Sequence, residues 1–318
     1  MTEPVSLARP RALKVGDRVA VLCVSSPVEP EALNAGLDAL RFAGLDPVVY
    51  PSARDPGTMR RYLAGDDAMR AGDLRSALTD PGIAGILFAR GGSGAQRTLE
   101  AMDWDGLGPE AETGMLPKVL AGYSDVTAVL EAVAVRLGWA SVFGPNIAIS
   151  QGASHYSFGS LLRTLMRPEQ ATMVEYPRAV TVVQGLARGV TTGGTLSLLV
   201  SSLGTGTSRP ARGGILLLED VNEEDYRIDR MLTQLRRSGY LDGVAGIVAG
   251  TFTGCGPPEA IQDILAERLG DLQVPMIAWA NVGHGGLFQA FPYGIAAELD
   301  ADAATQRLLV PPLGPPLS

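Results

Sequence analysis

The first half of the chain alternates between short apolar runs and longer amphipathic segments. Residues 18–24 (RVAVLCV) predict a buried strand, and residues 30–43 place Leu33, Leu37 and Leu40 on one face of a predicted helix. Another strand is expected at 47–50. Because strands alternate with helices, the order predicts an α/β protein with a parallel sheet covered by helices.

The alternation continues toward the middle of the chain. We expect helices at 66–79, 96–102 and 126–137 and strands at 83–89 and 119–122, with a tight glycine loop at 90–94. The second half predicts strands at 179–184, 214–218, 246–249 and 276–279 and one long helix at 227–238. We therefore expect an N-terminal domain at 1–170 and a C-terminal domain at 171–318, whose proline-rich tail at 309–318 is expected to be loosely attached.

Composition favours a packed globular protein large enough for two cores. Of 318 residues, 46% are apolar and 19% are charged. The net charge of −8 and the lack of a basic run argue against nucleic acid or an anionic membrane as the main partner. No secretory signal is visible near the N-terminus and no window approaches a membrane span, so a cytoplasmic location is expected.

Cysteine and histidine are both scarce, and this limits metal and redox chemistry. Cys23 and Cys255 lie outside any CxxC motif, so we expect two small buried side chains rather than a zinc or redox site. With only two histidines, His155 and His284, a histidine-rich metal site is not expected. A carboxylate-only cation site stays open as an alternative.

Ser124 is a candidate nucleophile because it follows a short apolar strand and precedes a helix. A serine at such a turn lies near the first amides of the helix, which lack intrahelical partners and can stabilise an oxyanion. Gly122 permits the sharp turn. The segment is only half of a G-x-S-x-G elbow, since position 126 is valine. Taken alone, Ser124 is explained at least as well as a helix N-cap.

His284 is the better candidate base, because glycines on both sides leave its ring accessible after an apolar strand. His155 lies in a polar, surface-like stretch, and a lone histidine is often only solvated or packed. Glu219 and Asp220 end another apolar strand, where a carboxylate can orient an imidazole. Spacing alone does not choose between these two acids. The acids at 223–225 are expected to solvate a loop and complement the start of the next helix.

The glycine loop at 90–94 could cradle an anion. A lone GGxG is a weak nucleotide signal, and neither G-x-G-x-x-G nor a P-loop lysine is present. An oxyanion amide from Gly91 or Gly92 is therefore favoured over a cofactor site, and no cofactor or metal is expected.

Taken in order, these motifs resemble the LD-carboxypeptidase family, which includes murein tetrapeptide carboxypeptidases and microcin-immunity hydrolases. The resemblance covers about residues 10–295. It is carried by LKVGD at 13–17, SSP at 25–27, YLAGD at 62–66, RAGDL at 70–74, RGGSG at 90–94, GYSDVT at 122–127, GGTLS at 193–197, LGT at 203–205, LED at 218–220, YRIDRML at 226–232, GH at 283–284 and PYG at 292–294.

The resemblance implies a serine hydrolase with a Rossmann-like N-terminal domain and a smaller β-rich C-terminal domain. By position, Ser124 would be the nucleophile, Glu219 the orienting carboxylate and His284 the base. The oxyanion hole would use the amide of Asp125 and one from the Gly91–Gly92 turn. Members are commonly homodimers and need no metal. Val24, Ser93 and the pair at 288–289 depart from the family's usual residues near the expected pocket.

Three functions are compatible with this resemblance. The first is hydrolysis of an L,D peptide bond, which releases D-alanine from a murein tetrapeptide during cell-wall recycling. The second is cleavage of an acyl-adenylate analogue; that branch is expected to stack adenine on an early aromatic of its second domain, and none occurs at 177–225. The third is a catalytically inactive protein that binds wall peptides. A nucleotide-dependent dehydrogenase is disfavoured by the missing fingerprint.

Overall fold

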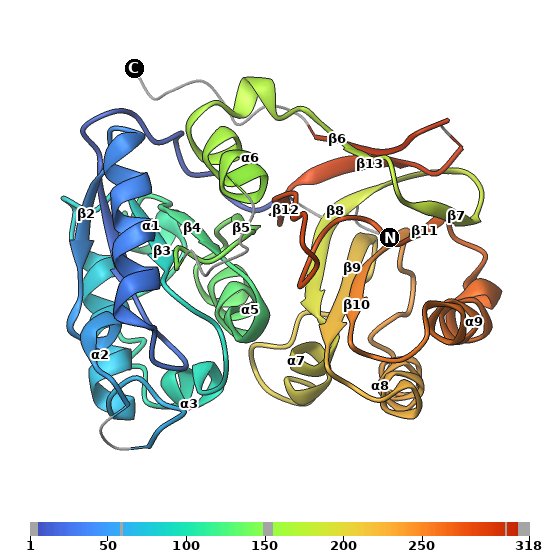
Figure 1. The fold of residues 1–318 in the computed structure, drawn as a ribbon, viewed down its shortest axis with the longest axis horizontal. Helices are drawn as coiled ribbons and strands as arrows, with labels where there is room; N and C mark the ends of the chain where they lie inside the picture. The colour runs from blue at the N-terminus through green and yellow to red at the C-terminus, as the bar shows by residue number, and fades with distance from the viewer. Residues whose placement is uncertain (1–5, 58–59, 149–154, 303, 311–318) are drawn as a thin grey trace.

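Two β-sheets lie side by side in the computed structural model, which describes residues 6–57, 60–148, 155–302 and 304–310 (Figure 1). The first sheet has the strand order β12-β5-β4-β3-β1-β2. Its strands are β1 (Arg18–Leu22), β2 (Asp46–Val49), β3 (Gly85–Phe88), β4 (Val119–Gly122), β5 (Ser141–Phe143) and β12 (Phe291–Tyr293). β1 to β5 run parallel, whereas β12 is antiparallel to β5.

Helices cover the first sheet, as the alternating pattern predicts. They are α1 (Pro30–Phe42), α2 (Asp67–Thr79), α3 (Ala95–Glu100), α4 (Glu110–Thr113), α5 (Thr127–Arg136) and α6 (His155–Met166), with the short 3₁₀ turns η1 (Pro51–Arg54), η2 (Ser124–Val126) and η3 (Pro168–Gln170). Pro30 stands at the first position of α1, and the Asp66 side chain caps α2 by accepting from the Met69 amide at 2.7 Å.

The second sheet is mixed, with the order β6-β14-β13-β8-β9-β10-β11-β7. Its strands are β6 (Met173–Tyr176), β7 (Val180–Val183), β8 (Leu186–Thr195), β9 (Gly214–Val221), β10 (Gly246–Thr253), β11 (Met276–Ala278), β13 (Ala296–Asp300) and β14 (Gln306–Leu309). β8 to β11 are parallel and the outer pairs are antiparallel. Helices α7 (Leu196–Ser201), α8 (Asp225–Arg237) and α9 (Pro258–Leu269) pack beside it, and the 3₁₀ turn η4 (Gly270–Leu272) follows α9 (Figure 1). The predicted α/β class is confirmed.

The two sheets share one apolar core. A single cluster of buried side chains includes Phe88 of the first sheet, Val129 and Val133 of α5, and Leu217 of the second sheet. Near its C-terminus the chain also returns to the first sheet, where Phe291 of β12 pairs with Phe143 of β5. The residues at the ends of β4 and β9 are therefore held on rigid, mutually packed elements.

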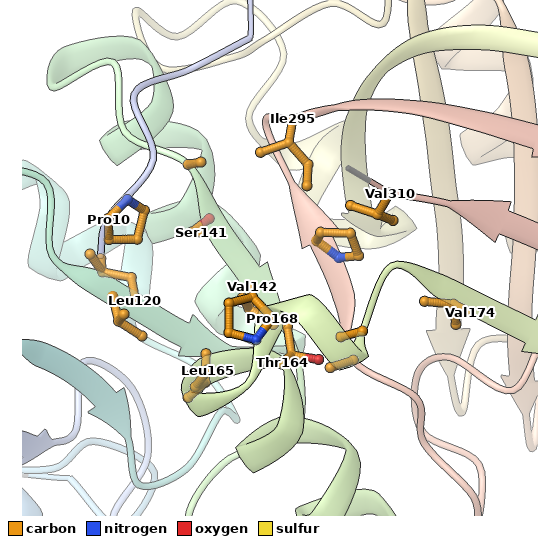
Figure 2. Close-up of a pocket in the computed structure, with 15 residues that line it drawn as sticks. Pro10, Leu120, Ser141, Val142, Thr164, Leu165, Pro168, Val174, Ile295 and Val310 are labelled. Carbon is orange, nitrogen blue, oxygen red and sulfur yellow. The ribbon is translucent and has the colours of Figure 1, made fainter. Parts of the chain in front are cut away.

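Two features named in the sequence analysis, the C-terminal tail and the side chain of His155, lie outside the described residues. The tail at 311–318 is not described, nor is the side chain of His155 at the start of α6. None of the helices in the described ranges combines the length and apolar character needed to cross a bilayer. An apolar pocket lies where β5, α6 and the second sheet meet (Figure 2), but Ser124, Glu219 and His284 are not among the residues that line it.

Candidate active site

The turn at Ser124 has the backbone of a strained strand-to-helix elbow. β4 ends at Gly122, and η2 begins at Ser124 and leads into α5. Ser124 has a φ of +65°, a left-handed conformation that non-glycine residues rarely adopt. Gly122 is required nearby, since a Cβ there would lie 2.9 Å from the Phe88 side chain. Such strain is typical of functional positions and is not needed for a simple N-cap.

The glycine loop lies directly against the Ser124 side chain. A Cβ added to Gly91 would lie 2.8 Å from Ser124 Cβ and 3.0 Å from its Oγ. Gly92 faces a different neighbour, because a Cβ there would lie 2.1 Å from Ser26 Oγ. Gly92 also has a φ of +111°, which glycine adopts without strain. The loop thus brings Gly91 beside the hydroxyl, while the use of its amides for an oxyanion stays a prediction.

His284 and Glu219 are joined by two hydrogen bonds. His284 Nδ1 lies 2.7 Å from Glu219 Oε2, and the His284 amide donates to the same oxygen at 3.1 Å. The Glu219 side chain is fully buried at the end of β9. Gly283 is needed for this approach, since a Cβ there would lie 2.3 Å from Glu219 Oε2. A carboxylate on Nδ1 keeps the proton there and leaves Nε2 as the basic nitrogen.

Thr195 is a second partner of Glu219 that the sequence interpretation did not assign. Its hydroxyl donates to Glu219 Oε1 at 2.5 Å, so both carboxylate oxygens are bound. The Thr195 amide donates to the Thr127 hydroxyl at 3.2 Å, which ties β8 to the first turn of α5. The only sequence signal was its position in the GGTLS motif at 193–197.

The contacts of Asp220 differ from those of its neighbour. Its carboxylate accepts from the Ser197 amide at 2.8 Å and from the Ser197 hydroxyl at 3.3 Å. Burial raises the pKa of Asp220 to about 6, and the backbone amides of Val221 and Ser197 oppose this shift. Of the two acids, Glu219 therefore faces the imidazole, and Asp220 holds the start of α7.

Aromatic rings link the histidine to the serine turn. The ring of Tyr123, the residue before Ser124, lies 4.8 Å from the His284 ring by centroid distance. Phe288 packs edge-on against Tyr123 at 4.9 Å and is buried, so this departure from the family pattern lies against the ring that contacts His284. No hydrogen bond within the described chain joins the Ser124 hydroxyl to the His284 ring. Such bonds are often long until substrate binds.

Metal-ligating side chains and the two cysteines were the other candidates for chemistry in the sequence. No group of three or more His, Cys, Asp or Glu side chains there is arranged to hold a metal ion. Cys23 and Cys255 are buried free thiols, and burial raises their pKa values to about 12 and about 11.

Comparison with known proteins identifies the family. The model of the LD-carboxypeptidase N-terminal domain matches residues 19–144, and that of the LD-carboxypeptidase C-terminal domain matches residues 188–299. The chain belongs to the LD-carboxypeptidase family. The chain is 47% identical to a putative carboxypeptidase of Streptomyces coelicolor, over 98% of this chain and 99% of that protein.

Two further matches extend the comparison. The chain is 30% identical to the murein tetrapeptide carboxypeptidase of Pseudomonas aeruginosa, over 91% of this chain and 94% of the other. Its fold matches the crystal structure of an MccF-like protein from Bacillus anthracis with a TM-score of 0.83. The two chains are 24% identical, and the match covers 95% of this one and 99% of the other. At that identity the likeness shows the fold alone.

Proposed function

We propose that this protein is a serine carboxypeptidase that hydrolyses an L,D peptide bond and releases D-alanine from a murein tetrapeptide. The observation that carries the proposal is the hydrogen bond between the buried Glu219 and the half-buried His284, whose ring packs on the residue next to the strained Ser124. The name of the Pseudomonas aeruginosa relative supports the substrate class.

The proposed chemistry assigns one task to each group. His284 Nε2 removes the hydroxyl proton of Ser124 as the Ser124 Oγ attacks the scissile carbonyl. The backbone amides of Asp125 and of Gly91 or Gly92 donate hydrogen bonds to the oxyanion that forms. His284 then protonates the leaving D-alanine amine. A water molecule, deprotonated by the same ring, hydrolyses the acyl-enzyme and restores Ser124. Glu219, bound by Thr195 on its other oxygen, orients the ring and stabilises its positive charge.

The alternatives have less support. Cleavage of an acyl-adenylate analogue would need an aromatic for adenine, and residues 177–225 contain none. An inactive binding protein would not need the strained φ of Ser124 or a carboxylate fully buried against His284. The proposal also includes a homodimer, which the family resemblance implies, and a cytoplasmic location in wall recycling. It places a boundary near residue 170 between the domain carrying the nucleophile and the domain carrying its partners.

Release of D-alanine tests the proposal. Purified protein is incubated with murein tetrapeptide, and the tripeptide and free D-alanine are quantified by mass spectrometry. We expect stoichiometric release by the wild type and a loss of at least about 1000-fold in Ser124→Ala. Failure to release D-alanine at any enzyme concentration, with turnover of an acyl-sulfamoyl adenylate instead, would favour the second candidate.

A further inference from the structure

The carboxylate of Asp125 makes contacts that the proposed mechanism does not use. The mechanism needs only the backbone amide of this residue, yet its side chain is buried. Asp125 Oδ2 accepts from the Ser25 hydroxyl at 2.6 Å and from the Ala95 amide at 2.7 Å. Ala95 is the first residue of α3, directly after the glycine loop. One oxygen atom next to Ser124 therefore binds the end of the loop that carries Gly91.

Ser26, the residue after Ser25, holds the glycine loop at Gly91 and Ser93. The Ser26 amide donates to the Gly91 carbonyl at 3.2 Å, and the Ser26 hydroxyl accepts from the Ser93 amide at 3.1 Å. Since Ser25 and Ser26 are consecutive, the same backbone segment binds Asp125 and the loop. The three parts form a closed ring of contacts: nucleophile turn, serine pair and glycine loop.

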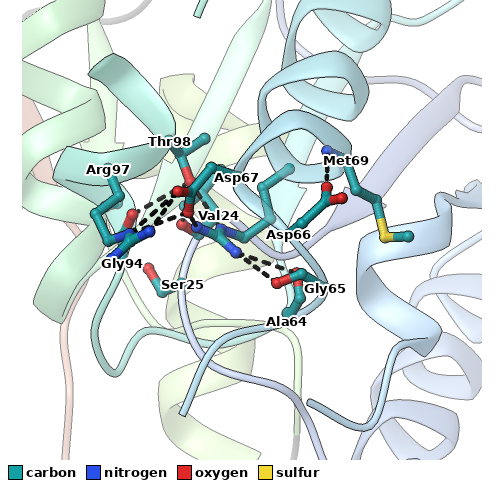
Figure 3. Close-up of polar contacts among 12 residues, drawn as sticks. Val24, Ser25, Ala64, Gly65, Asp66, Asp67, Met69, Gly94, Arg97 and Thr98 are labelled. Atoms are coloured by element: carbon teal, nitrogen blue, oxygen red, sulfur yellow. Dashed lines mark hydrogen bonds and ion pairs between the residues drawn. The ribbon is translucent and has the colours of Figure 1, made fainter. Parts of the chain in front are cut away.

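The buried Arg70 holds the segment after β1 and the helix α3, to which these groups are attached. Its partners Thr98 and Gly65 are labelled in Figure 3. Arg70 is fully buried and donates from Nε to Thr98 Oγ1 at 2.9 Å and from Nη1 to the Gly65 carbonyl at 2.8 Å. The Thr98 hydroxyl donates in turn to the carbonyl of Val24, the residue before Ser25, at 2.7 Å. Arg70 thus fixes α3 and the start of the serine pair with respect to each other.

These contacts hold a carboxyl group where burial disfavours its charged form. Burial raises the pKa of Asp125, while its bonds to Ser25 and the Ala95 amide and the charge of Arg70 lower it. A buried carboxylate without a structural task would be costly to keep. Here its task is to connect two segments that the proposed mechanism needs at a fixed separation.

We propose that the Asp125 side chain is a positioning residue that holds the glycine loop against Ser124, so that the two oxyanion amides face the same point. The proposal rests on the proposed function, because it concerns the oxyanion hole of that reaction. Loss of a whole oxyanion donor typically costs about 100- to 1000-fold in rate. A displaced loop retains part of the interaction, so we expect a fall of about 10- to 100-fold in kcat when Asp125 loses its carboxylate.

Variants of Asp125 and one matched residue separate positioning from stability. Asp125→Ala removes the acceptor, whereas Asp125→Asn keeps a neutral oxygen that can accept from both Ser25 and Ala95. The control is Asp73→Ala, since Asp73 is also a buried aspartate of this sheet's helices and accepts from the Ser52 amide at 2.7 Å. For each variant we would measure melting temperature, kcat and KM on murein tetrapeptide, and the rate of reaction with a fluorophosphonate.

The expected pattern is specific to the oxyanion hole. In Asp125→Ala, kcat and the fluorophosphonate rate fall together by about 10- to 100-fold while KM changes less than about 3-fold, and Asp125→Asn recovers most of both. Asp73→Ala lowers the melting temperature without this loss. Equal rates in the two alanine variants would overturn the proposal, as would a failure of Asp125→Asn to recover activity.

The fluorophosphonate separates this proposal from the substrate assignment, because its phosphoryl oxygen needs the oxyanion hole but no murein peptide. If wild-type protein reacts with the probe but releases no D-alanine, the assigned substrate is wrong and the comparison of Asp125 variants still decides the positioning role. If wild-type protein does not react with the probe, both proposals fail.

Discussion

A buried glutamate on α5 should make the stability of the fold depend on pH. Glu131 is fully buried, and burial raises its pKa from the usual 4.5 to about 7. The Arg209 amide donates to its Oε1 at 3.2 Å, and the Arg209 charge favours the ionised form. Burial, and after it the charge of Glu131, raises the pKa values of the nearby Tyr240 and Tyr293. Arg209 belongs to the second half of the chain, so the cluster joins both halves.

The raised pKa of Glu131 means that the fold should lose stability as the pH rises. Because the folded protein binds the Glu131 proton more tightly than the unfolded chain, the stability from this group is complete below pH 4.5 and is lost as pH rises through about 7. A shift from 4.5 to about 7, at about 1.4 kcal/mol per unit, corresponds to at most about 3.5 kcal/mol. Most of it, about 2 to 3 kcal/mol, should be lost between about pH 5 and pH 8.

Glu131→Gln mimics the protonated side chain and tests this directly. The free energy of unfolding is measured in urea at a series of pH values for wild type, Glu131→Gln and the exposed control Glu112→Gln. The difference between Glu131→Gln and wild type should grow by about 2 to 3 kcal/mol in favour of glutamine between about pH 5 and pH 8. Parallel pH curves for the two proteins would refute the reasoning, as would an equal effect in Glu112→Gln.

Two further substitutions test contacts of the candidate site. Thr195→Val leaves Oε1 of the fully buried Glu219 without its 2.5 Å donor, so it should destabilise the fold by about 1 to 3 kcal/mol and lower kcat about 10-fold; unchanged melting and kcat would contradict this. Gly91→Ala puts a Cβ 2.8 Å from that of Ser124 and should lower kcat at least about 10-fold. The control Gly72→Ala lies on α2, where the added Cβ meets no neighbouring atom within 4 Å, and should keep full activity. A similar fall in kcat in both variants would contradict the close packing of Gly91 against Ser124 as the cause.

Elements with a strong local pattern were predictable from the sequence. β1 was expected from an apolar run whose residues from Val19 to Leu22 are all fully buried, as in a sheet covered on both faces. α1 was expected from the spacing of Leu33, Leu37 and Leu40, which are buried on one face. The candidate residues Ser124, Glu219 and His284 were chosen because each ends or follows an apolar run in the sequence and because the motifs occur in the family's order.

Strands without a local pattern and contacts between distant segments were not predictable in this way. β8 was missed because residues 186–195 (LARGVTTGGT) carry no apolar run, although the second half of this strand is buried between β13 and β9. The pairing of β12 with the first sheet joins residues far apart in the chain and leaves no local signal. The same holds for the Ser25–Asp125 bond, which spans 100 positions, and for Thr195–Glu219, which spans 24. Such bonds depend on how the sheets pack, which local periodicity does not encode.

The central claim is that Ser124 is a nucleophile activated by His284 and oriented through Glu219. Intact-mass measurement and peptide mapping after fluorophosphonate treatment test it most directly. The account predicts a single adduct on the peptide containing Ser124, formed at least about 100-fold more slowly in His284→Ala and measurably more slowly in Glu219→Gln. An adduct on another residue, or formation at the wild-type rate without His284, would contradict it.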